Sequence, residues 1–525
     1  MADSSSSGPL SVRTAEVIGA LSLATDLAMG FPLEHGLRST LVAMRLCDRL
    51  EVDAETASQT YFLCLLFYVG CNAPADVGWE VFGDDDSLRT YATPSRFGTR
   101  AEMARGMMRA VAPPTGPPLV RVWRVARHLP ALAAGFPGVI AATCEVARML
   151  TNKLSLSDGV SQLFAFESER WDGKGMPHGV AEEGIPLAVR IAHVARDAAV
   201  QHMLGDAGFV GEVIGRRAGG AFDPVIAELL AEEAAEILDA GSEATQWDLT
   251  LASEPKPWLM LEGEAIDQAL AAMGHFSDMA LPELVGHSGG VSQTCRLAAE
   301  TLSLDPAEEA MLCRAALVHD LGRVAVPVRI WERAGPLTFD DWERVRLHAY
   351  QTERILTQSP FLAGLIPAAG SHHERLDGSG YHRGIGASSL HPLARLLAAA
   401  DAYHAMTEPR PHRAAFSPGQ AAEILTEQAR VGRLGPEAVA AVLEAAGHRS
   451  PSVEQPAGLT EREVQVVGLL ARGLQTKQIA RKLRISAKTA DFHIQNAYRK
   501  MGVSTRAGAT LFAMQHGLLT WENSR

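Results

Sequence analysis

Three segments of the chain recur in the same order further along the sequence, and this repeat limits the possible folds more than any other feature. Pro32–Ala57 parallels Pro282–Ala310, and Glu167–Gly179 (ESERWDGKGMPHG) parallels His372–Gly384 (HHERLDGSGYHRG). A third segment, IPLAVRIAHVARDA, parallels HPLARLLAAADAYHA. Ordered self-similarity of this kind indicates one structural unit built twice. We therefore predict two copies of one domain in tandem.

The apolar residues of both copies are spaced as in amphipathic helices, for example in AAEILTEQARVGRLGPEAVAAVLEAAG, and no alternating β-branched run predicts a sheet. The predicted fold class is all-α. A Pro/Ser/Gly-rich stretch, HRSPSVEQPAG, reads as a linker before a C-terminal module. The predicted domains are a degenerate first copy at 1–204, a connecting helical segment at 205–257, a second copy at 258–447, the linker at 448–458 and the module at 459–525.

The net charge of −13 is unevenly distributed along the chain. Between Leu459 and Leu519 there are ten basic and three acidic residues, which gives this module +7 and leaves −20 for the remainder. A basic module on an acidic body predicts a polyanionic partner for the module alone. The six cysteines form no C-x-x-C pair and the apolar run YFLCLLFYVGC is too short to span a bilayer, so we expect a cytoplasmic protein with no membrane partner.

The second copy carries imidazole and carboxylate groups at the ends of apolar helical stretches. Such groups are costly to bury unless they are paired or bind a metal. Glu283 and His287 are four residues apart, which would place both on one helix face. Oxygen and nitrogen donors without cysteine favour an Mn or Fe site over structural zinc. The candidate ligands are Glu283, His287, His319, Asp320, His348, His372, His373 and Asp401.

This pattern resembles the HD-GYP domain over roughly residues 280–413. The His319-Asp320 pair matches the HD pair, and His372 to Tyr381 matches H-H-E-x-x-D-G-x-G-Y. The resemblance implies a phosphohydrolase of cyclic di-GMP with two or three metal ions, which clamp the phosphodiester and activate a water. It assigns His319, Asp320 and Arg323 to catalysis, and Arg323, Tyr381, Arg410 and Arg413 to the substrate.

Three positions of the second copy depart from the HD-GYP pattern. Arg323 replaces a lysine, His382 replaces the proline of GYP, and His404 replaces the second aspartate of D-x-x-D. None removes a proposed metal ligand. Three hypotheses therefore remain open: hydrolysis of a cyclic dinucleotide, binding of one with reduced turnover so that the domain senses it, and hydrolysis of another nucleotide.

In the first copy the equivalent positions have lost the metal-binding residues. The HD pair aligns with Phe67-Tyr68, the paired histidines with Glu167-Ser168, and the late aspartate with Arg196 or its neighbourhood. Phenylalanine and tyrosine cannot replace bridging ligands, so we expect no metal there. A sensory or dimerising domain and a scaffold without a ligand are equally compatible with this loss.

The basic module begins with a capping box, Thr460 as N-cap and Glu463 three residues on. Ser486 should cap the recognition helix of a helix-turn-helix, with Phe492, Ala497 and Met501 turned inward. The four-helix module resembles the LuxR/FixJ-type DNA-binding domain, which implies double-stranded DNA as partner. One small module offers few base contacts, so we also expect a homodimer on a two-fold related site. The residues expected to contact bases are Lys488, Thr489, Asp491 and His493. The residues expected to contact phosphates are Lys477, Gln478, Arg484, Arg499 and Lys500. The chain is thus predicted to be a transcriptional regulator with a cyclic-dinucleotide domain.

Overall fold

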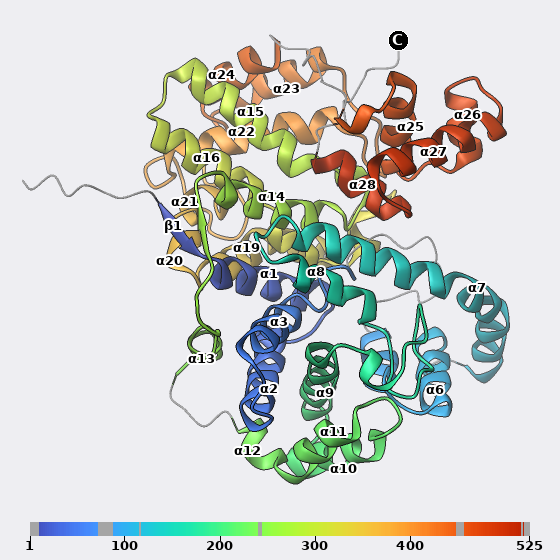
Figure 1. The fold of residues 1–525 in the computed structure, drawn as a ribbon. Coiled ribbons are helices and arrows are strands. Elements are labelled where there is room, and N and C mark those ends of the chain that lie inside the picture. Colours follow the sequence, from blue (N-terminus) through green and yellow to red (C-terminus); the bar gives the residue numbers. More distant parts are fainter. Residues whose placement is uncertain are drawn as a thin grey trace, which may run out of the picture. The chain divides into compact units, whose positions relative to one another are not determined.

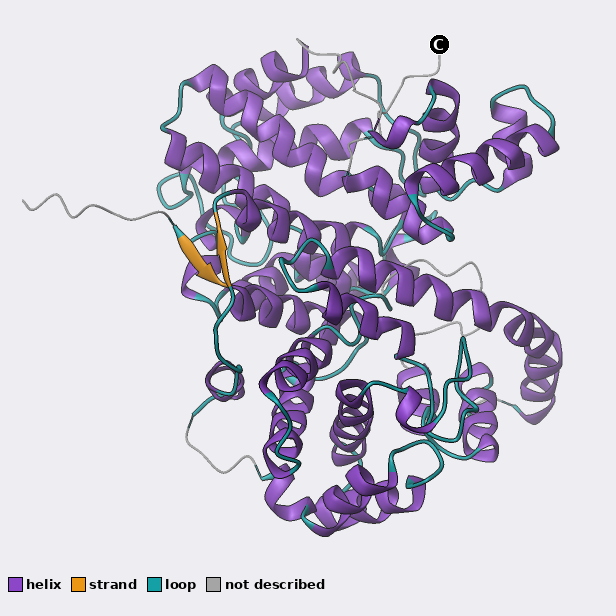
Figure 2. Cartoon of the chain, in the orientation of Figure 1, coloured by secondary structure: helices purple, strands orange, loops and turns teal. Residues whose placement is uncertain are grey.

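The protein is known here from a computed structural model, which describes residues 10–71, 88–114, 117–239, 244–447, 456–515 and 518. Most of these residues are helical, and the described ranges contain one two-stranded sheet, β1 (Ser11–Arg13) antiparallel to β2 (Met260–Glu262) (Figure 2). The all-α prediction is confirmed. No helix within the described ranges combines the length and the hydropathy that crossing a bilayer requires. All six cysteines are free thiols.

The chain divides into two compact units, residues 1–266 and 267–525. The first unit runs from blue to green in Figure 1, and its helix α2 packs against α3, α9 and α13. Its helices are α1 (Thr14–Ala28), α2 (His35–Arg49), α3 (Ala54–Leu65), α6 (Arg100–Val111), α7 (Pro118–Thr151), α8 (Asp158–Leu163), α9 (Leu187–His202), α10 (Ala207–Arg217), α11 (Pro224–Glu232), α12 (Ala234–Leu238) and α13 (Gln246–Ala252), with short helical turns η1 (Leu88–Ala92), η2 (Thr93–Ser95), η3 (Phe164–Phe166) and η4 (Glu182–Gly184).

The segment 205–257, predicted as a connection between the copies, packs as part of the first unit. Helix α10 lies against α9 and α11, and α13 lies against α2. Tyr61 donates a hydrogen bond to the carbonyl oxygen of Thr250 (3.0 Å), and the sheet joins residues near both ends of the unit. These long-range contacts place the boundary later than the sequence composition suggested.

In the second unit, α15 packs against α16, α22 and α24. Local signals start these helices: the Asp305 side chain caps α16 and the Ser417–Gln420 capping box starts α23, each followed by a proline at the first helical position. The helices are α14 (Glu264–Asp278), α15 (His287–Leu302), α16 (Pro306–Val318), α17 (Val328–Trp331), α18 (Phe339–Arg346), α19 (His348–Leu356), α20 (Pro360–Ala363), α21 (Ile366–Ala369), α22 (Pro392–Thr407), α23 (Pro418–Arg430) and α24 (Pro436–Gly447), with turns η5 (Pro282–Leu284) and η6 (Leu321–Ala325).

The C-terminal module follows η7 (Pro456–Gly458), and most of the predicted linker, residues 448–455, lies outside the described ranges. Its capping box is present, since the Thr460 side chain accepts from the Glu463 backbone N–H and the Glu463 carboxylate accepts from that of Thr460. Helix α25 packs against α27 and α28, and α26 packs against α27. The helices are α25 (Glu461–Ala471), α26 (Thr476–Lys482), α27 (Ala487–Met501) and α28 (Arg506–Gln515).

The two units repeat several local interactions, within the aligned glycine-rich turns and at the start of the aligned helices α2 and α15. The Asp26 carboxylate accepts from the backbone N of Gly36 (3.0 Å), the second residue of α2. The Asp278 carboxylate likewise accepts from the backbone N of Ser288 (2.9 Å), the second residue of α15. In the glycine-rich turns, Glu169 accepts from the backbone N of His178 (2.7 Å) and Glu374 from that of Arg383 (3.0 Å). In both turns a glycine takes a left-handed conformation that other residues rarely adopt: Gly173 at φ 66° and Gly378 at φ 77°.

Candidate metal centre and DNA-binding helix

Seven of the eight predicted metal ligands converge in the interior of the second unit. His287 is the first residue of α15, His319 and Asp320 follow the end of α16, and Asp401 lies within α22. His348 opens α19, and His372 and His373 sit in the turn after α21. The side chains are buried, with His287, His319 and His372 at 0% exposure and Asp320 at 1%, although His373 is slightly open.

The donors form two groups that share Asp320 as neighbour. One group is Asp320, His348, His372 and His373, and the other is His287, His319 and Asp401, with the ligand atoms of each group within 4.8 Å of one another. Asp320 Oδ1 lies 3.2 Å from His348 Nε2, whereas Asp320 Oδ2 lies 3.4 Å from His319 Nε2. A carboxylate with one oxygen toward each group suits a bridge between two cations.

Hydrogen bonds at the far side of three rings prepare these histidines for a cation. The Nδ1 atoms of His319, His348 and His372 contact the backbone oxygens of Ala316, Val345 and Ala369 at 2.7, 2.6 and 2.6 Å. A carbonyl oxygen can only accept, so each Nδ1 carries a proton and each ring turns its Nε2 toward the other candidate ligands. Within the described part of the chain, buried His287 Nε2, His319 Nε2 and Asp320 Oδ1 have no hydrogen-bond partner, and Asp320 Oδ2 is in an ion pair with Arg323 Nη1 at 2.9 Å. Buried nitrogen and oxygen atoms without a hydrogen-bond partner are what a metal centre would occupy as ligands.

The protonation states also suit a cation. Burial would raise the pKa of Asp320, but the Arg323 guanidinium and the His319 ring hold it well below its usual range. Burial lowers the pKa of His372 to about 4, which keeps this ring neutral. Burial also opposes charge on His319, but the Asp320 and Asp401 carboxylates outweigh it and raise its pKa to about 9. The field that attracts a proton there would equally attract a metal ion.

Glu283, the eighth predicted ligand, does not join these groups. It lies in the 3-10 turn η5, while His287 begins α15 after the left-handed Gly286 (φ 86°). The expectation that the two share one helix face is therefore wrong, because the helix starts only at His287. Glu283 Oε2 is buried without a hydrogen-bond partner in the described ranges, so a role for it as a ligand stays a prediction.

The four residues predicted to contact the substrate differ in the intramolecular contacts that their side chains already make. Arg323 Nη1 lies 2.9 Å from Asp320 Oδ2, and the Tyr381 ring packs against His373 with centroids 4.2 Å apart. Arg410 Nη2 donates to Glu408 Oε2 (2.9 Å). Arg413 instead donates to backbone oxygens that include those of Met406 (3.1 Å) and Glu408 (3.2 Å), which occupies it at the end of α22.

In the first unit a guanidinium fills the place that the alignment gives to the metal ligands. Arg196 is 3% exposed, and its Cζ lies 4.5 Å from the ring centroids of both Phe67 and Tyr68. Its Nε donates to the Tyr68 hydroxyl at 2.6 Å. Burial, together with the charge of Arg196, lowers the pKa of His35 to about 3, so this histidine, which the repeat pairs with His287, is neutral. That the first copy binds no metal stays a prediction.

Replacing Arg196 by alanine should lower the free energy of unfolding by about 3 kcal/mol or more. The change removes two desolvated cation–π contacts and a hydrogen bond, and it leaves a cavity. Urea unfolding of the full chain measures the effect. Arg216→Ala is the matched control, since Arg216 is exposed and its nearest carboxylate oxygen, of Glu212, is 3.9 Å away. Equal stability of the two variants would contradict this role for Arg196.

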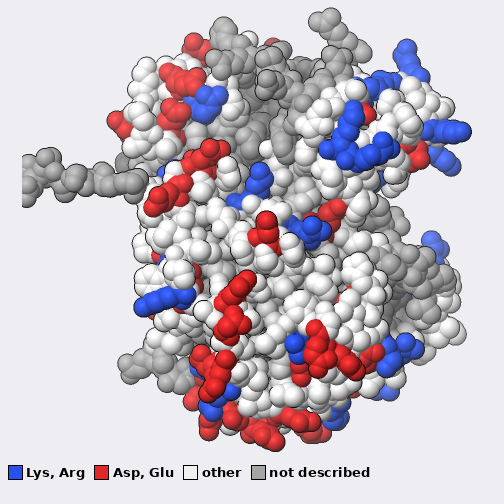
Figure 3. Space-filling model, in the orientation of Figure 1, with Lys and Arg blue, Asp and Glu red and all other residues white. Residues whose placement is uncertain are grey.

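The C-terminal module presents a basic face around its recognition helix, and Lys and Arg side chains gather over it in the view of Figure 3. The Ser486 hydroxyl accepts from Thr489 N (3.0 Å), so α27 begins where the sequence predicted. The following predicted contact residues are exposed, and His493 is half-buried: Lys477, Gln478, Arg484, Lys488, Thr489, Asp491, Arg499 and Lys500.

In α27 one packing expectation is wrong, and the predicted phosphate contact of Lys500, which stays a prediction, has a competing partner inside the module. Phe492, predicted inward, is 60% exposed, and Ile494 is buried in the module together with Ala497 and Met501. Lys500, predicted to touch phosphate, donates to Glu463 Oε2 (2.6 Å) and to the backbone oxygen of Gly458 (2.9 Å). The Lys500 ammonium therefore neutralises the Glu463 carboxylate of the α25 capping box.

Lys488→Ala and Lys500→Ala should consequently differ in kind. Lys488 lies exposed in the first turn of α27, so its loss should weaken DNA binding by ~1–3 kcal/mol if it reads a base. Lys500→Ala should lower module stability by about 1 kcal/mol and leave the salt slope of binding nearly unchanged. Fluorescence anisotropy with a duplex selected from a random pool and a scrambled duplex, at several salt concentrations, measures the first. If Lys500→Ala reduced the salt slope of DNA binding without lowering stability, the predicted phosphate contact of Lys500 would be supported instead.

Comparison with known proteins places both parts of the chain. The HD domain model matches residues 273–438, and the model of bacterial regulatory proteins of the luxR family matches residues 457–513. The chain is 30% identical over 438 residues to 3'3'-cGAMP-specific phosphodiesterase 3 of Vibrio cholerae, which covers 82% of this chain and 94% of that protein. The chain belongs to the HD-GYP family.

A solved structure and a further member agree with this assignment. The crystal structure of a cyclic GMP-AMP-specific phosphodiesterase of V. cholerae matches with TM-score 0.58 and 26% identity, over 84% of this chain and 99% of that one. A cyclic di-GMP phosphodiesterase of Pseudomonas aeruginosa is 34% identical over 134 residues, 25% of this chain and 32% of that protein. This HD-GYP protein also carries a LuxR-type DNA-binding domain.

Sequence reasoning missed Glu408, whose carboxylate contacts the His287 ring on the side away from the other candidate ligands. Glu408 is 0% exposed, and its carboxylate lies 3.0 Å from His287 Nδ1, 2.7 Å from His404 Nδ1 and 2.9 Å from Arg410 Nη2. With His287 and His404 it forms a third group that could hold a cation. The available signal was local: an acid one turn after His404, at the position where α22 ends.

Proposed function

We propose that the second unit is a metal-dependent phosphodiesterase of a 3',3'-cyclic dinucleotide. The observation that carries the proposal is Asp320, whose two oxygens face two buried groups of imidazole and carboxylate side chains. Two divalent ions of the Mn or Fe type would be held by His287, His319, Asp320, His348, His372, His373 and Asp401, with Glu283 as a candidate for a third. Bound ions would supply Lewis acidity and lower the pKa of a water near the phosphodiester.

The remaining residues of the site would orient the substrate. The Arg323 guanidinium, next to Asp320, would donate to a phosphate oxygen, and its planar fork favours two parallel hydrogen bonds. The Tyr381 ring, packed on His373, forms an apolar wall for a base. Arg410 and Arg413 remain candidates for phosphate contacts. The similarity to a 3'3'-cGAMP-specific enzyme supports this dinucleotide beside cyclic di-GMP.

The test is turnover by the full chain, loaded anaerobically with Mn or Fe, of 3',3'-cGAMP, cyclic di-GMP, cyclic di-AMP and bis(p-nitrophenyl) phosphate. We expect conversion of a 3',3'-linked guanine dinucleotide to its linear product by chromatography. Saturable binding without turnover would favour a sensor, which the ion pair between Arg323 and Asp320 and the replacement by His404 also support. Conversion of bis(p-nitrophenyl) phosphate alone would favour another nucleotide as substrate, and neither binding nor turnover would refute the proposal.

We further infer a regulator in which the first unit is a degenerate copy of the second. The matched caps and glycine turns of the two units support the duplication, and the Arg196–Phe67–Tyr68 cluster supports loss of metal. The DNA-binding domain would act in the cytoplasm as a homodimer on a two-fold related site, because one small helical module offers few base contacts. Analytical ultracentrifugation with and without DNA tests the dimer.

A further inference from the structure

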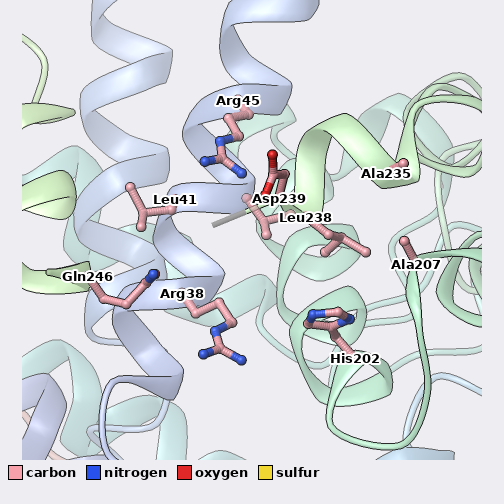
Figure 4. A pocket seen from close by; sticks show the side chains of 10 residues that line it. Arg38, Leu41, Arg45, His202, Ala207, Ala235, Leu238, Asp239 and Gln246 are labelled. Atoms are coloured by element: carbon pink, nitrogen blue, oxygen red, sulfur yellow. The ribbon is translucent and has the colours of Figure 1, made fainter. Parts of the chain in front are cut away.

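The first unit contains a cavity of about 360 Å³ whose lining residues belong neither to the candidate metal centre nor to the DNA-binding module. It lies between α2, the end of α9 and the helices that follow α11, and the close view in Figure 4 shows its lining. Leu41 and Leu238 provide apolar wall, and Arg38, Arg45 and His202 provide nitrogen donors. This volume is in the range of pockets for small metabolites, roughly 300–1,000 Å³.

The arginines of α2 differ in whether they form ion pairs. Arg49, one turn beyond the cavity, is neutralised by Glu233 and Glu236 at 2.8 Å each. Arg38 has no ion pair and no side-chain hydrogen bond with any residue in the described ranges. Arg38 and Arg45 are seven residues apart, two helical turns, so both project from one face of α2. The cavity therefore receives two guanidinium groups of which one is unpaired.

Of the other two donors, Arg45 is held in place by a hydrogen bond and His202 has an unpartnered ring nitrogen. Arg45 Nη1 donates to the backbone oxygen of Ile237 at 2.6 Å, which fixes the guanidinium at the wall and leaves other N–H groups available. His202 Nδ1 is buried and has no hydrogen-bond partner in the described part of the chain. In Figure 4 Arg38 and His202 approach the cavity from opposite walls, and Arg45 lies toward its other end. Asp239 also lines the cavity, so the fixed charges there leave an excess of one positive charge.

We propose that this cavity binds a small phosphate monoester of about mononucleotide size. A phosphate monoester offers three acceptor oxygens, which match a planar guanidinium fork and an imidazole N–H better than a single carboxylate does. The apolar side chains between the two ends suit a flat ring attached to the phosphate. The ligand of the first unit is then a small anion, bound without a metal ion, and the proposal is independent of turnover in the second unit.

The test is calorimetric titration of the full chain, pretreated with EDTA so that the second-unit centre cannot retain ligand through metal. The probes are 5'-AMP, 5'-GMP, inorganic phosphate and citrate. We expect saturable binding of a nucleoside monophosphate, weakened about tenfold or more by Arg38→Ala and by His202→Ala, and weakened less by Arg38→Lys. Arg216→Ala, an exposed arginine of the same unit, should bind like the unchanged protein.

Two results would overturn the assignment. Binding that Arg38→Ala and His202→Ala leave unchanged would place the ligand outside this cavity. Citrate bound as tightly as the nucleoside monophosphates, or no binding of any probe, would reject the phosphate monoester as ligand class. Arg38 is exposed, so its replacement should not prevent folding, and circular dichroism of each variant checks this.

Discussion

Asp320→Asn should lose both metal ions and reduce turnover about a thousandfold. Asp320 is the residue whose oxygens face both groups of histidines, at 3.2 Å from His348 Nε2 and 3.4 Å from His319 Nε2. An amide nitrogen in place of one oxygen removes a ligand atom and the negative charge that attracts the cations. Loss of several kcal/mol of transition-state stabilisation corresponds to about three factors of ten in rate.

The measurement combines elemental analysis of the anaerobically purified protein with the turnover assay. Asp320→Asn is preferred because it keeps the shape of the side chain, and His319→Ala together with Asp320→Ala provides the stronger lesion. The matched control is Asp267→Asn, since Asp267 is half-exposed and pairs with Arg314 at 2.6 Å outside the metal centre. Unchanged metal content in both Asp320 variants would show that the site lies elsewhere.

Glu408→Ala should weaken metal binding about 10–100-fold although Glu408 is itself a member of neither of the two groups around Asp320. Its carboxylate accepts from His287 Nδ1, which fixes the ring so that Nε2 points to the other ligands. The same carboxylate accepts from His404 and Arg410, so removing it leaves one buried and two partly buried donors without this partner. Glu408→Gln should be intermediate, because an amide oxygen still accepts one of these hydrogen bonds.

Competition with a chelator, titrating Mn into the metal-free chain, measures this effect without any turnover. Glu427→Ala is the control, since the Glu427 carboxylate pairs with Arg430 on the exposed face of α23. A merely structural role would lower stability in both Glu408 variants without separating their metal affinities. Equal metal affinity in Glu408→Ala, Glu427→Ala and the unchanged chain would contradict the proposed orientation of His287.

The departures from the HD-GYP pattern take on a different meaning in the structure. His404 replaces an aspartate, yet an acid one turn further on, Glu408, lies 2.7 Å from its ring. The negative charge is therefore retained near the centre although the sequence position has changed. Arg323 keeps its positive charge beside Asp320, at 2.9 Å, and packs over the Trp331 ring at 5.0 Å. These contacts are compatible with a working site and leave turnover to be measured.

The sequence alone determined the features that depend on neighbours along the chain. Capping boxes join residues three apart, so Thr460–Glu463 and the start of α27 at Ser486 could be predicted directly. Helical spacing determined the fold class, and the motif residues predicted seven candidate ligands that the structure brings into two groups. Each of these signals is contained in a short segment whose chemistry is the same in any surrounding structure.

Only the tertiary structure decided which groups meet across long distances in the chain. His287 and Glu408 are 121 residues apart, and the Lys500–Glu463 ion pair joins residues 37 apart on two helices. Phe492 and Ile494 are two residues apart and both apolar, so periodicity left open which of them packs inward. The neighbouring helices decided in favour of Ile494, at 5% exposure, because burial depends on what packs against a face and not on the face itself.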